Sequence, residues 1–277
     1  MTSTTFKIGG DLSVRRLGFG AMHLPAEPAP ARENAVAIAR RAVELGVTLI
    51  DTAYMYGWGA NEEILAEALH PYPDDLLVTT KVGIDNPGGE WAQNARPAAL
   101  RTQVDSALRR LRVDRIGLVQ LHRIDPAVPL ADQLGALGEI QAAGKIGHIG
   151  LSEITVDELA RAREIIDVAS VQNRYNLLDR EHEPVLKACE DAGIAFLPWR
   201  PVAWGKSGEQ SEIATMASEL DATPTQLVLA WLLDHSPVML PIPGTANLAH
   251  LEENVAAAGL ELSQDHRARL DGLAEKA

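Results

Sequence analysis

The 277-residue sequence predicts a (β/α)8 (TIM) barrel, in which eight parallel strands close into a ring surrounded by eight helices. Short apolar runs alternate with longer helical patterns, most of the apolar runs lack the alternation of a half-exposed strand, and the junctions are short. No linker, low-complexity tract or charge block divides the chain, so we expect a single domain over residues 1–277. A doubly wound open sheet is the alternative that this pattern leaves open.

The opening stretch TFKIGGDLSVRRLGFG predicts a β-hairpin that leads into the first strand of the barrel. Gly9, Gly10 and Asp11 are typical of tight turns between two strands. We expect this hairpin to cap the bottom of the barrel, the end at which the parallel strands begin.

Eight apolar runs are expected to form the strands of the barrel. They are mostly hydrophobic throughout, as strands that are covered on both faces should be. The runs cover residues 15–20, 47–51, 76–81, 116–122, 146–152, 169–173, 194–199 and 238–242.

Helical patterns lie between these runs and carry recognisable start and stop signals. The segment 34–46 ends on Gly46, and the segment 96–112 has Pro97 near its start and basic residues near its end. A further pattern ends at Leu69. The remaining helices are predicted over residues 130–145, 155–167, 181–193, 223–236 and 247–259.

The composition is that of an ordinary globular protein, with 46% hydrophobic and 23% charged residues. The formal net charge of -13 disfavours nucleic acid and anionic membranes as partners. The single cysteine, Cys189, permits no intrachain disulfide, and its helical context indicates a core position. The polar start is not a secretory signal, and no run of about 18 apolar residues is present to span a bilayer. We therefore expect a cytoplasmic protein.

Titratable side chains stand where three consecutive predicted strands end, which is the end of a barrel that carries its chemistry. Asp51 ends the second strand and Tyr56 follows in its loop; Lys81 ends the third strand and His122 the fourth. Singly, these residues have ordinary explanations as a turn cap, loop packing, a surface lysine and a structural histidine. Four such groups at adjacent strand ends favour one common pocket.

These four groups suit the transfer of a proton from a phenol. A free tyrosine has a pKa of about 10, a neighbouring ammonium stabilises its phenolate, and a carboxylate holds the ammonium charged. A neutral histidine can donate a hydrogen bond that orients a carbonyl oxygen. The set would protonate an oxygen that gains negative charge, as a carbonyl oxygen does when its carbon receives a hydride.

Several other motifs are incomplete. The stretch LGFGAMH lacks the third glycine of a Rossmann fingerprint, and GKS at 205–207 lacks the earlier glycine of a phosphate loop. No H-x-H or H-E-x-x-H motif is present, so we assign no metal. A zinc-dependent barrel hydrolase therefore has little support as an alternative.

The chain resembles the aldo-keto reductase superfamily along nearly its whole length. The resemblance lies in LIDTAYMYGWGANEEILAEAL, VTTKVG, GLVQLHRID, GKIGHIGLSE, VQNRYNLLDR and LPIPGTANLAHLEEN, in this order. The stretches FKIGGDLSVRRLGFGAMHL and PIPGTANLAHLEENVAA are most similar to bacterial members that include pyridoxal reductases. The resemblance implies a barrel that binds NADPH without a Rossmann domain. It also implies a catalytic tetrad in which Tyr56 is the general acid, Lys81 and Asp51 tune it, and His122 orients the carbonyl.

The resemblance also implies a cofactor site. Gly20, Ala21, Met22 and Asp51 should lie near the nicotinamide, with Ser152 and Gln172 on its carboxamide and Trp199 stacked on its ring. The loop from Arg200 to Ser207 should fold over the pyrophosphate, through Arg200, Pro201, Val202, Gly205 and Lys206. The adenosine end should contact Ile242, Pro243, Gly244, Thr245, His250, Glu253 and Asn254, with Gln226 nearby.

Two positions depart from the family pattern. Glu153 stands where the family usually has asparagine, so either its carboxylate turns away from the carboxamide or the site is tuned differently. Ala246 stands where the family often has arginine or lysine, which could relax the choice between NADP and NAD. We expect NADPH as the cofactor, with NADH also possible.

The substrate is expected to be a small carbonyl compound that contacts Met22, Tyr56, Trp58, Trp91, His122 and Trp204. Aromatic walls suit flat or apolar aldehydes, and pyridoxal is one candidate. A cofactor-sensing barrel that acts as a binding partner of another protein is the second hypothesis. The sequence leaves the oligomeric state open.

Overall fold

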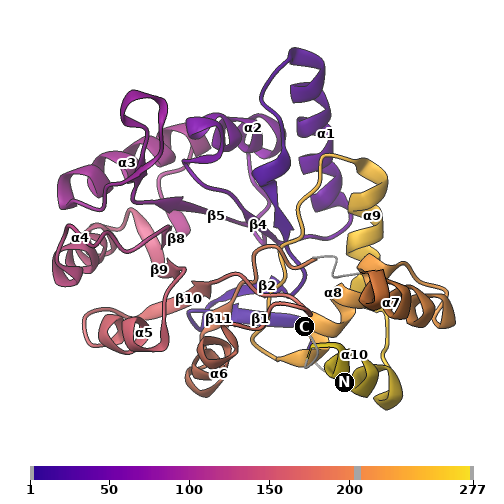
Figure 1. The fold of residues 1–277 in the computed structure, drawn as a ribbon. Coiled ribbons are helices and arrows are strands. Elements are labelled where there is room, and N and C mark those ends of the chain that lie inside the picture. Colours follow the sequence, from indigo (N-terminus) through magenta and orange to yellow (C-terminus); the bar gives the residue numbers. More distant parts are fainter. Residues whose placement is uncertain (1–2, 203–206, 275–277) are drawn as a thin grey trace.

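Seven parallel strands form a curved central sheet in the computed structural model, which describes residues 3–202 and 207–274 (Figure 1). The strand order is β11-β10-β9-β8-β5-β4-β3, so neighbours in the sheet follow the order of the chain. The strands are β3 (Phe19–Gly20), β4 (Leu49–Asp51), β5 (Leu77–Val82), β8 (Ile116–Leu121), β9 (Ile146–Ser152), β10 (Val168–Gln172) and β11 (Ala195–Phe196). Each corresponds to a predicted run.

The segment 238–243 occupies the eighth position and joins the two edges of the sheet. On one side Phe196 N donates to Val238 O at 2.9 Å, and Leu240 N donates to Phe196 O at 2.8 Å. On the other side the amides of Gly18 and Gly20 donate to the carbonyls of Pro241 and Pro243 at 2.9 and 3.1 Å. The eighth predicted strand is therefore an irregular extended segment, because each proline lacks the N–H that a regular ladder needs.

The backbones approach closely at this seam. A Cβ atom on Gly20 would lie 2.6 Å from Ile242 O, and a Cβ atom on Gly244 would lie 2.6 Å from Gly20 O. Any side chain at either position would push the two edges apart. The two glycines thus allow the ring to close, and the (β/α)8 barrel predicted from the sequence is confirmed.

The N-terminal hairpin covers the bottom of the barrel, as expected. Strands β1 (Thr5–Ile8) and β2 (Leu12–Arg15) pair antiparallel, and their apolar side chains pack against residues inside the barrel such as Leu49 and Leu118. Asp11 in the turn is 2.6 Å from the Nε2 atom of His148, near the start of β9. The hairpin therefore closes the end at which the strands begin, which leaves their opposite ends for a site.

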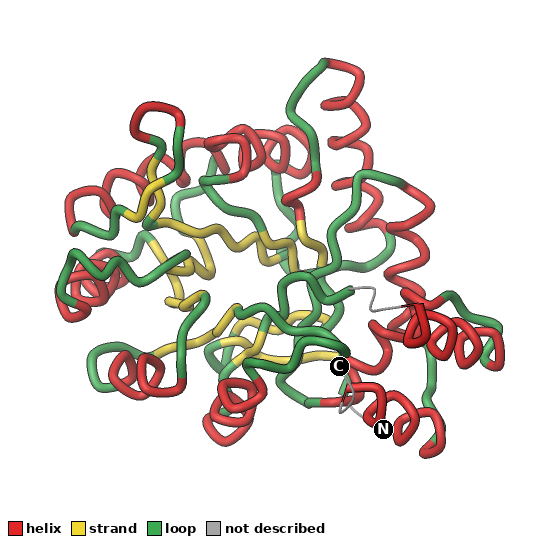
Figure 2. The backbone as a smooth tube through the Cα atoms, viewed as in Figure 1, coloured by secondary structure: helices red, strands yellow, loops and turns green. Residues whose placement is uncertain are grey.

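Helices surround the ring of strands (Figure 2). The predicted helices are α1 (Ala29–Glu44), α2 (Ala60–Leu69), α3 (Pro97–Leu111), α4 (Leu130–Ala142), α5 (Val156–Arg163), α6 (Glu183–Ala192), α8 (Pro224–His235) and α9 (Leu248–Ala256). Helix α1 begins before residue 34 because Pro30 fits its first turn, where an amide has no helical partner. Thr155 and Thr223 cap α5 and α8 with complete capping boxes, which fixes both starts near the predicted residues.

Two helices were not predicted. These are α7 (Ser207–Glu219) and α10 (Gln264–Ala274), which pack against each other, and α7 also packs against α8 (Figure 1). Short 3-10 turns and the small β6 (Ile84–Asp85) and β7 (Ala92–Gln93) hairpin complete the loops. Cys189 is fully buried in the main apolar core, and this burial raises the pKa of its thiol to about 12.

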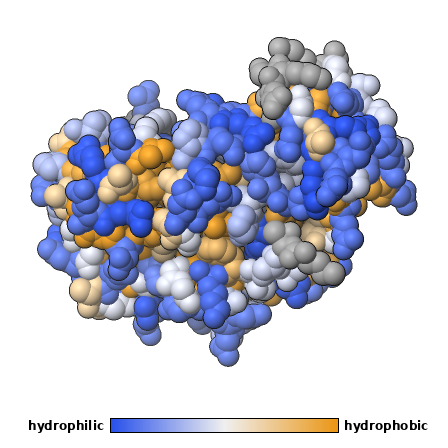
Figure 3. All heavy atoms as spheres, turned by 90° about the horizontal axis from the view of Figure 1, so that it is seen from below, coloured by the Kyte–Doolittle hydropathy of each residue, from blue (hydrophilic) through white to orange (hydrophobic). Residues whose placement is uncertain are grey.

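Figure 3 shows one face of the molecule, on which hydrophilic side chains predominate and hydrophobic ones form patches between them. Within residues 3–202 and 207–274, no helix has the length and apolar character needed to cross a membrane. The same residues contain no cluster of three or more histidine, cysteine, aspartate or glutamate side chains that is placed to hold a metal ion.

Candidate active site

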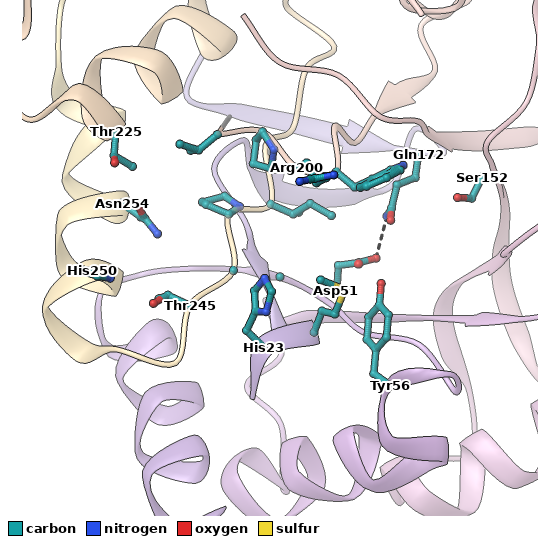
Figure 4. A pocket seen from close by; sticks show the side chains of 18 of the residues that line it. His23, Asp51, Tyr56, Ser152, Gln172, Arg200, Thr225, Thr245, His250 and Asn254 are labelled. Atoms are coloured by element: carbon teal, nitrogen blue, oxygen red, sulfur yellow. Dashed lines mark hydrogen bonds between the residues drawn. The ribbon is translucent and has the colours of Figure 1, made fainter. Parts of the chain in front are cut away.

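A cavity of about 950 Å³ lies at the end of the barrel where the strands finish. Its wall includes residues at or just after the ends of several strands, among them Gly20, Asp51, His122, Ser152 and Gln172. Figure 4 shows two regions of this cavity: Asp51, Tyr56, Ser152 and Gln172 lie at one end, and Thr225, Thr245, His250 and Asn254 lie at the other.

A buried ion pair forms the base of the first region. Lys81 Nζ lies 2.5 Å from Asp51 Oδ2, and the two side chains are only 0% and 3% exposed. Burial lowers the pKa of Lys81, but the charge of Asp51 and the phenol of Tyr56 outweigh this effect and raise it above the usual value. Lys81 is therefore an ammonium group that is held away from solvent.

The phenol of Tyr56 stands between this ammonium and the cavity. Its oxygen accepts a hydrogen bond from Lys81 Nζ at 3.3 Å, and its side chain lines the cavity (Figure 4). The residue begins a 3-10 turn, Tyr56–Gly59, in which Gly57 has a φ of 62°. A left-handed conformation of this kind suits glycine and allows the chain to turn sharply after β4.

His122 forms the neighbouring wall of the cavity. Its ring lies edge-on to the ring of Tyr56, with 6.2 Å between the centroids. Burial, together with the positive charges of Lys81 and Arg123, lowers the pKa of His122 to about 2. The imidazole is consequently neutral near pH 7 and can donate a hydrogen bond without carrying a charge.

Two glutamine side chains donate hydrogen bonds to the carboxylate of Asp51. The Nε2 atoms of Gln120 and Gln172 each donate to Asp51 Oδ1 at 3.0 Å, and both side chains are buried. Gln172 also lines the cavity, so it links the carboxylate to the region where the carboxamide contact is expected. Gln120 was not predicted as a site residue, although a polar side chain within the apolar run 116–122 is the signal that could have indicated it.

Glu153 turns toward Trp199 and is not among the residues that line the cavity. Its Oε1 atom accepts hydrogen bonds from Trp199 Nε1 and from the backbone amide of Arg174. The φ angle of Glu153 is 56°, a left-handed conformation directly after the end of β9. Ser152 lines the cavity. Glu153 instead accepts a hydrogen bond from the indole of Trp199, which forms another part of the cavity wall.

The second region of the cavity is built on the start of α9. Asn247 caps this helix by accepting a hydrogen bond from the amide of His250, and Thr245 Oγ1 accepts one from the amide of Asn247. Thr223 donates to Glu253 Oε1 at 2.6 Å, and Gln226 donates to the carbonyl of Glu253. A capped helix N-terminus presents the positive end of the helix dipole, which suits a phosphate group.

Most of the predicted site residues line this cavity. The lining residues that were predicted are Gly20, Met22, Asp51, Tyr56, His122, Ser152, Gln172, Trp199, Arg200, Pro201, Val202, Ile242, Pro243, Gly244, Thr245, His250, Glu253 and Asn254. Lys81 lies behind Tyr56 rather than in the wall. Trp204, Gly205 and Lys206 lie outside the described residues.

Three of the predicted site residues are not part of the cavity wall. Ala21 is fully buried and forms no part of the cavity wall. Trp58 packs edge-on against Tyr54 at 5.8 Å, and Trp91 is 56% exposed beside the β6–β7 hairpin, so neither lines the cavity. Both tryptophans follow strands as expected, but neither is among the residues of the cavity wall.

Four residues of the wall were not predicted: His23, Met55, Arg123 and Thr225. His23 and Met55 adjoin predicted residues in loops that follow strands, so their position along the chain was a usable signal. Arg123 follows His122 directly, and a charged residue at a strand end is the same kind of signal that identified the tetrad.

The sequence matches the Aldo/keto reductase family over residues 16–275, and the chain belongs to this family. Among its relatives is the pyridoxine 4-dehydrogenase of Escherichia coli, which is 40% identical over 287 residues and 100% of both chains. An uncharacterized oxidoreductase of Schizosaccharomyces pombe is 45% identical over 96% of this chain and 89% of the relative.

Solved structures of similar proteins share the fold. An aldo/keto reductase from Klebsiella pneumoniae, in complex with NADP and acetate, has a TM-score of 0.88 at 29% identity, over 98% of this chain and 95% of that one. The glycerol dehydrogenase of Gluconobacter oxydans has a TM-score of 0.89 at 26% identity, over 100% and 96% of the chains.

Proposed function

We propose that this protein reduces aldehydes or ketones to alcohols with a hydride from NADPH, and that Tyr56 donates the proton. The observation that carries this proposal is the phenol of Tyr56, which has a buried ammonium at 3.3 Å on one side and the cavity on the other. Membership of the aldo/keto reductase family supports the reaction class.

The residues of the cavity fit a nicotinamide cofactor. A volume of about 950 Å³ lies within the usual range for ligand sites, and the capped start of α9 suits a phosphate group at the far end. Ser152, Gln172 and Trp199 would hold the nicotinamide, and Thr245, His250 and Asn254 would hold the adenosine phosphate end. NADPH supplies the hydride when it is bound. NADH is a possible second cofactor, because Ala246 provides no positive charge for a 2′-phosphate.

Residues of the chain then orient the carbonyl, donate the proton and stabilise the phenolate. Neutral His122 donates a hydrogen bond to the carbonyl oxygen and orients it, since its depressed pKa keeps the imidazole uncharged. Tyr56 gives its proton to the same oxygen as negative charge develops there. The ammonium of Lys81 stabilises the phenolate that remains, and Asp51, held by Gln120 and Gln172, keeps the ammonium in place.

Pyridoxal-type or other aromatic aldehydes are the proposed substrates. Pyridoxine 4-dehydrogenase of Escherichia coli, which is similar over the full length of this chain, supports this choice. The second candidate function is a catalytically weak, cofactor-sensing barrel that binds another protein. A sensor would bind NADPH but consume almost none of it in the presence of carbonyl compounds.

The substitution Tyr56→Phe tests the proton donor. We expect kcat/KM for pyridoxal or a reactive aromatic aldehyde to fall by about 10²–10⁴-fold, whereas the Kd of NADPH stays close to that of the wild type. Tyr54→Phe is the matched control, because Tyr54 packs against Trp58 and Arg110 outside the cavity wall. Full turnover in Tyr56→Phe would remove this residue from the acid role, and negligible turnover of all substrates by the wild type would favour the sensor.

A further inference from the structure

Arg123 lines the cavity next to the tetrad and has no part in the mechanism above. Its Nη1 atom donates to the carbonyl of His122 at 2.5 Å and to Ser152 Oγ at 3.2 Å. These bonds tie the half-buried side chain to the ends of β8 and β9 and use both hydrogens of one nitrogen. Within residues 3–202 and 207–274, the Nε and Nη2 atoms have no hydrogen-bond acceptor.

Among the described residues, the guanidinium of Arg123 forms no ion pair. No carboxylate of the described residues lies within 4.0 Å of this guanidinium. The two carboxylates at this end of the site are held by other donors: Asp51 by Lys81 and two glutamines, and Glu153 by Trp199 and the amide of Arg174. Burial lowers the pKa of Arg123, and the nearby charge of Glu153 and the phenol of Tyr56 offset this effect only in part.

A half-buried cation without a partner is unfavourable in the free protein, and a ligand anion would offset that cost. The open Nε and Nη2 atoms form the planar fork that matches the two oxygens of a carboxylate. We propose that Arg123 is a specificity-determining residue that binds an oxyanion of the carbonyl substrate. This inference rests on the proposed reductase function.

The position of Arg123 defines the substrate class. Because it follows His122 in the chain and is anchored to Ser152, the bound oxyanion lies beside the carbonyl, toward the end of β9. The preferred substrates are therefore aldehydes or ketones that carry a carboxylate, a phosphate or an ionised phenol close to the reacting carbonyl. Pyridoxal belongs to this class, because its ring bears an ionisable hydroxyl group next to the aldehyde.

Calorimetry with benzoate and benzamide tests the anion site without turnover, using the full chain with NADP⁺ present. We expect the wild type to bind benzoate at least about 10-fold more tightly than benzamide. Arg123→Gln should lose about 10- to 100-fold in benzoate affinity and less than about threefold in benzamide affinity. Arg101→Gln, which removes the same charge on the exposed face of α3, is the control and should leave both affinities unchanged. Equal benzoate affinity in the wild type and Arg123→Gln overturns the proposal.

Kinetics with phenylglyoxylate, whose carboxylate adjoins the ketone carbon, and with its methyl ester test the same site during reduction. Arg123→Gln should lower kcat/KM for the carboxylate by about 10- to 100-fold, change it by less than about threefold for the ester, and leave the Kd of NADPH unchanged. Arg123→Lys should recover part of the loss. An equal loss with both substrates, or an equal loss of NADPH affinity, overturns the proposal. If the wild type reduces no carbonyl compound, the reductase function fails, while the benzoate result still decides the anion site.

Discussion

Removal of the buried ammonium by Lys81→Met should cost both stability and activity. The substitution leaves the carboxylate of Asp51 buried and removes the ion pair between its Oδ2 atom and Lys81 Nζ, which are 2.5 Å apart. Breaking a buried ion pair on one side costs about 3–5 kcal/mol. The two glutamine amides still donate to Oδ1 at 3.0 Å, so we expect the lower end, about 3 kcal/mol. This loss corresponds to a fall in Tm of about 6–12 °C for a protein of this size.

The double substitution Asp51→Asn with Lys81→Met separates the two effects. It removes both charges but keeps a side-chain oxygen that can accept from Gln120 and Gln172. Because no buried charge is left unpaired, we expect about 2 kcal/mol of the stability to return. Activity should not return, since Tyr56 still lacks the ammonium at 3.3 Å.

Urea unfolding at pH 7 measures the stabilities, and NADPH oxidation with a reactive aldehyde measures the activities. We expect kcat/KM to stay at least about 10²-fold below the wild type in both variants. A single variant as stable as the wild type, or a double variant less stable than the single one, would refute the reasoning about the buried charge.

Two further predictions concern neighbouring residues. His122 has a folded pKa of about 2 against about 6.5 when unfolded, so only the unfolded state takes up its proton as the pH falls below 6.5. The wild type should therefore lose up to about 2 kcal/mol from this group between pH 6.5 and pH 5, and His122→Gln should show a correspondingly weaker dependence in urea unfolding. Glu153→Ala should free the indole of Trp199, change its fluorescence and weaken NADPH binding several-fold, whereas Glu153→Gln should preserve both because its amide oxygen still accepts from Trp199 and Arg174. Wild-type fluorescence and NADPH affinity in Glu153→Ala would contradict this role.

The barrel was predictable because its strands are continuous apolar runs that end near residues with obvious chemistry. The pattern of apolar, turn and capping residues in the sequence also predicted the hairpin and the helices whose starts carry caps, such as Thr155 and Thr223. It missed α7 and α10 because their sequences are largely polar and show only weak apolar periodicity. The run 238–242 was predicted as a strand although Pro241 lacks the N–H that a regular ladder needs; the hydrogen bonds that hold the segment come from residues about 40 and 220 positions away.

The site was less predictable wherever the direction of a side chain decides its role. Trp58 and Trp91 stand on loops after strands, but Trp58 packs edge-on against Tyr54 and neither residue is part of the cavity wall. Glu153 was ambiguous because its left-handed backbone, which has no sequence signature in a glutamate, turns it toward Trp199. Arg123 was missed although it directly follows His122; that its guanidinium has no carboxylate within 4.0 Å among the described residues is visible only in the structure.

The seam of the barrel is also a wall of its cavity. The segment that links Phe196 to Gly18 and Gly20 contributes Ile242, Pro243 and Gly244 to the lining. A ligand that contacts these residues should oppose separation of the two edges of the sheet, and so should help to hold the barrel closed. We therefore expect the stability of the folded barrel to rise with the concentration of a ligand that binds at this seam.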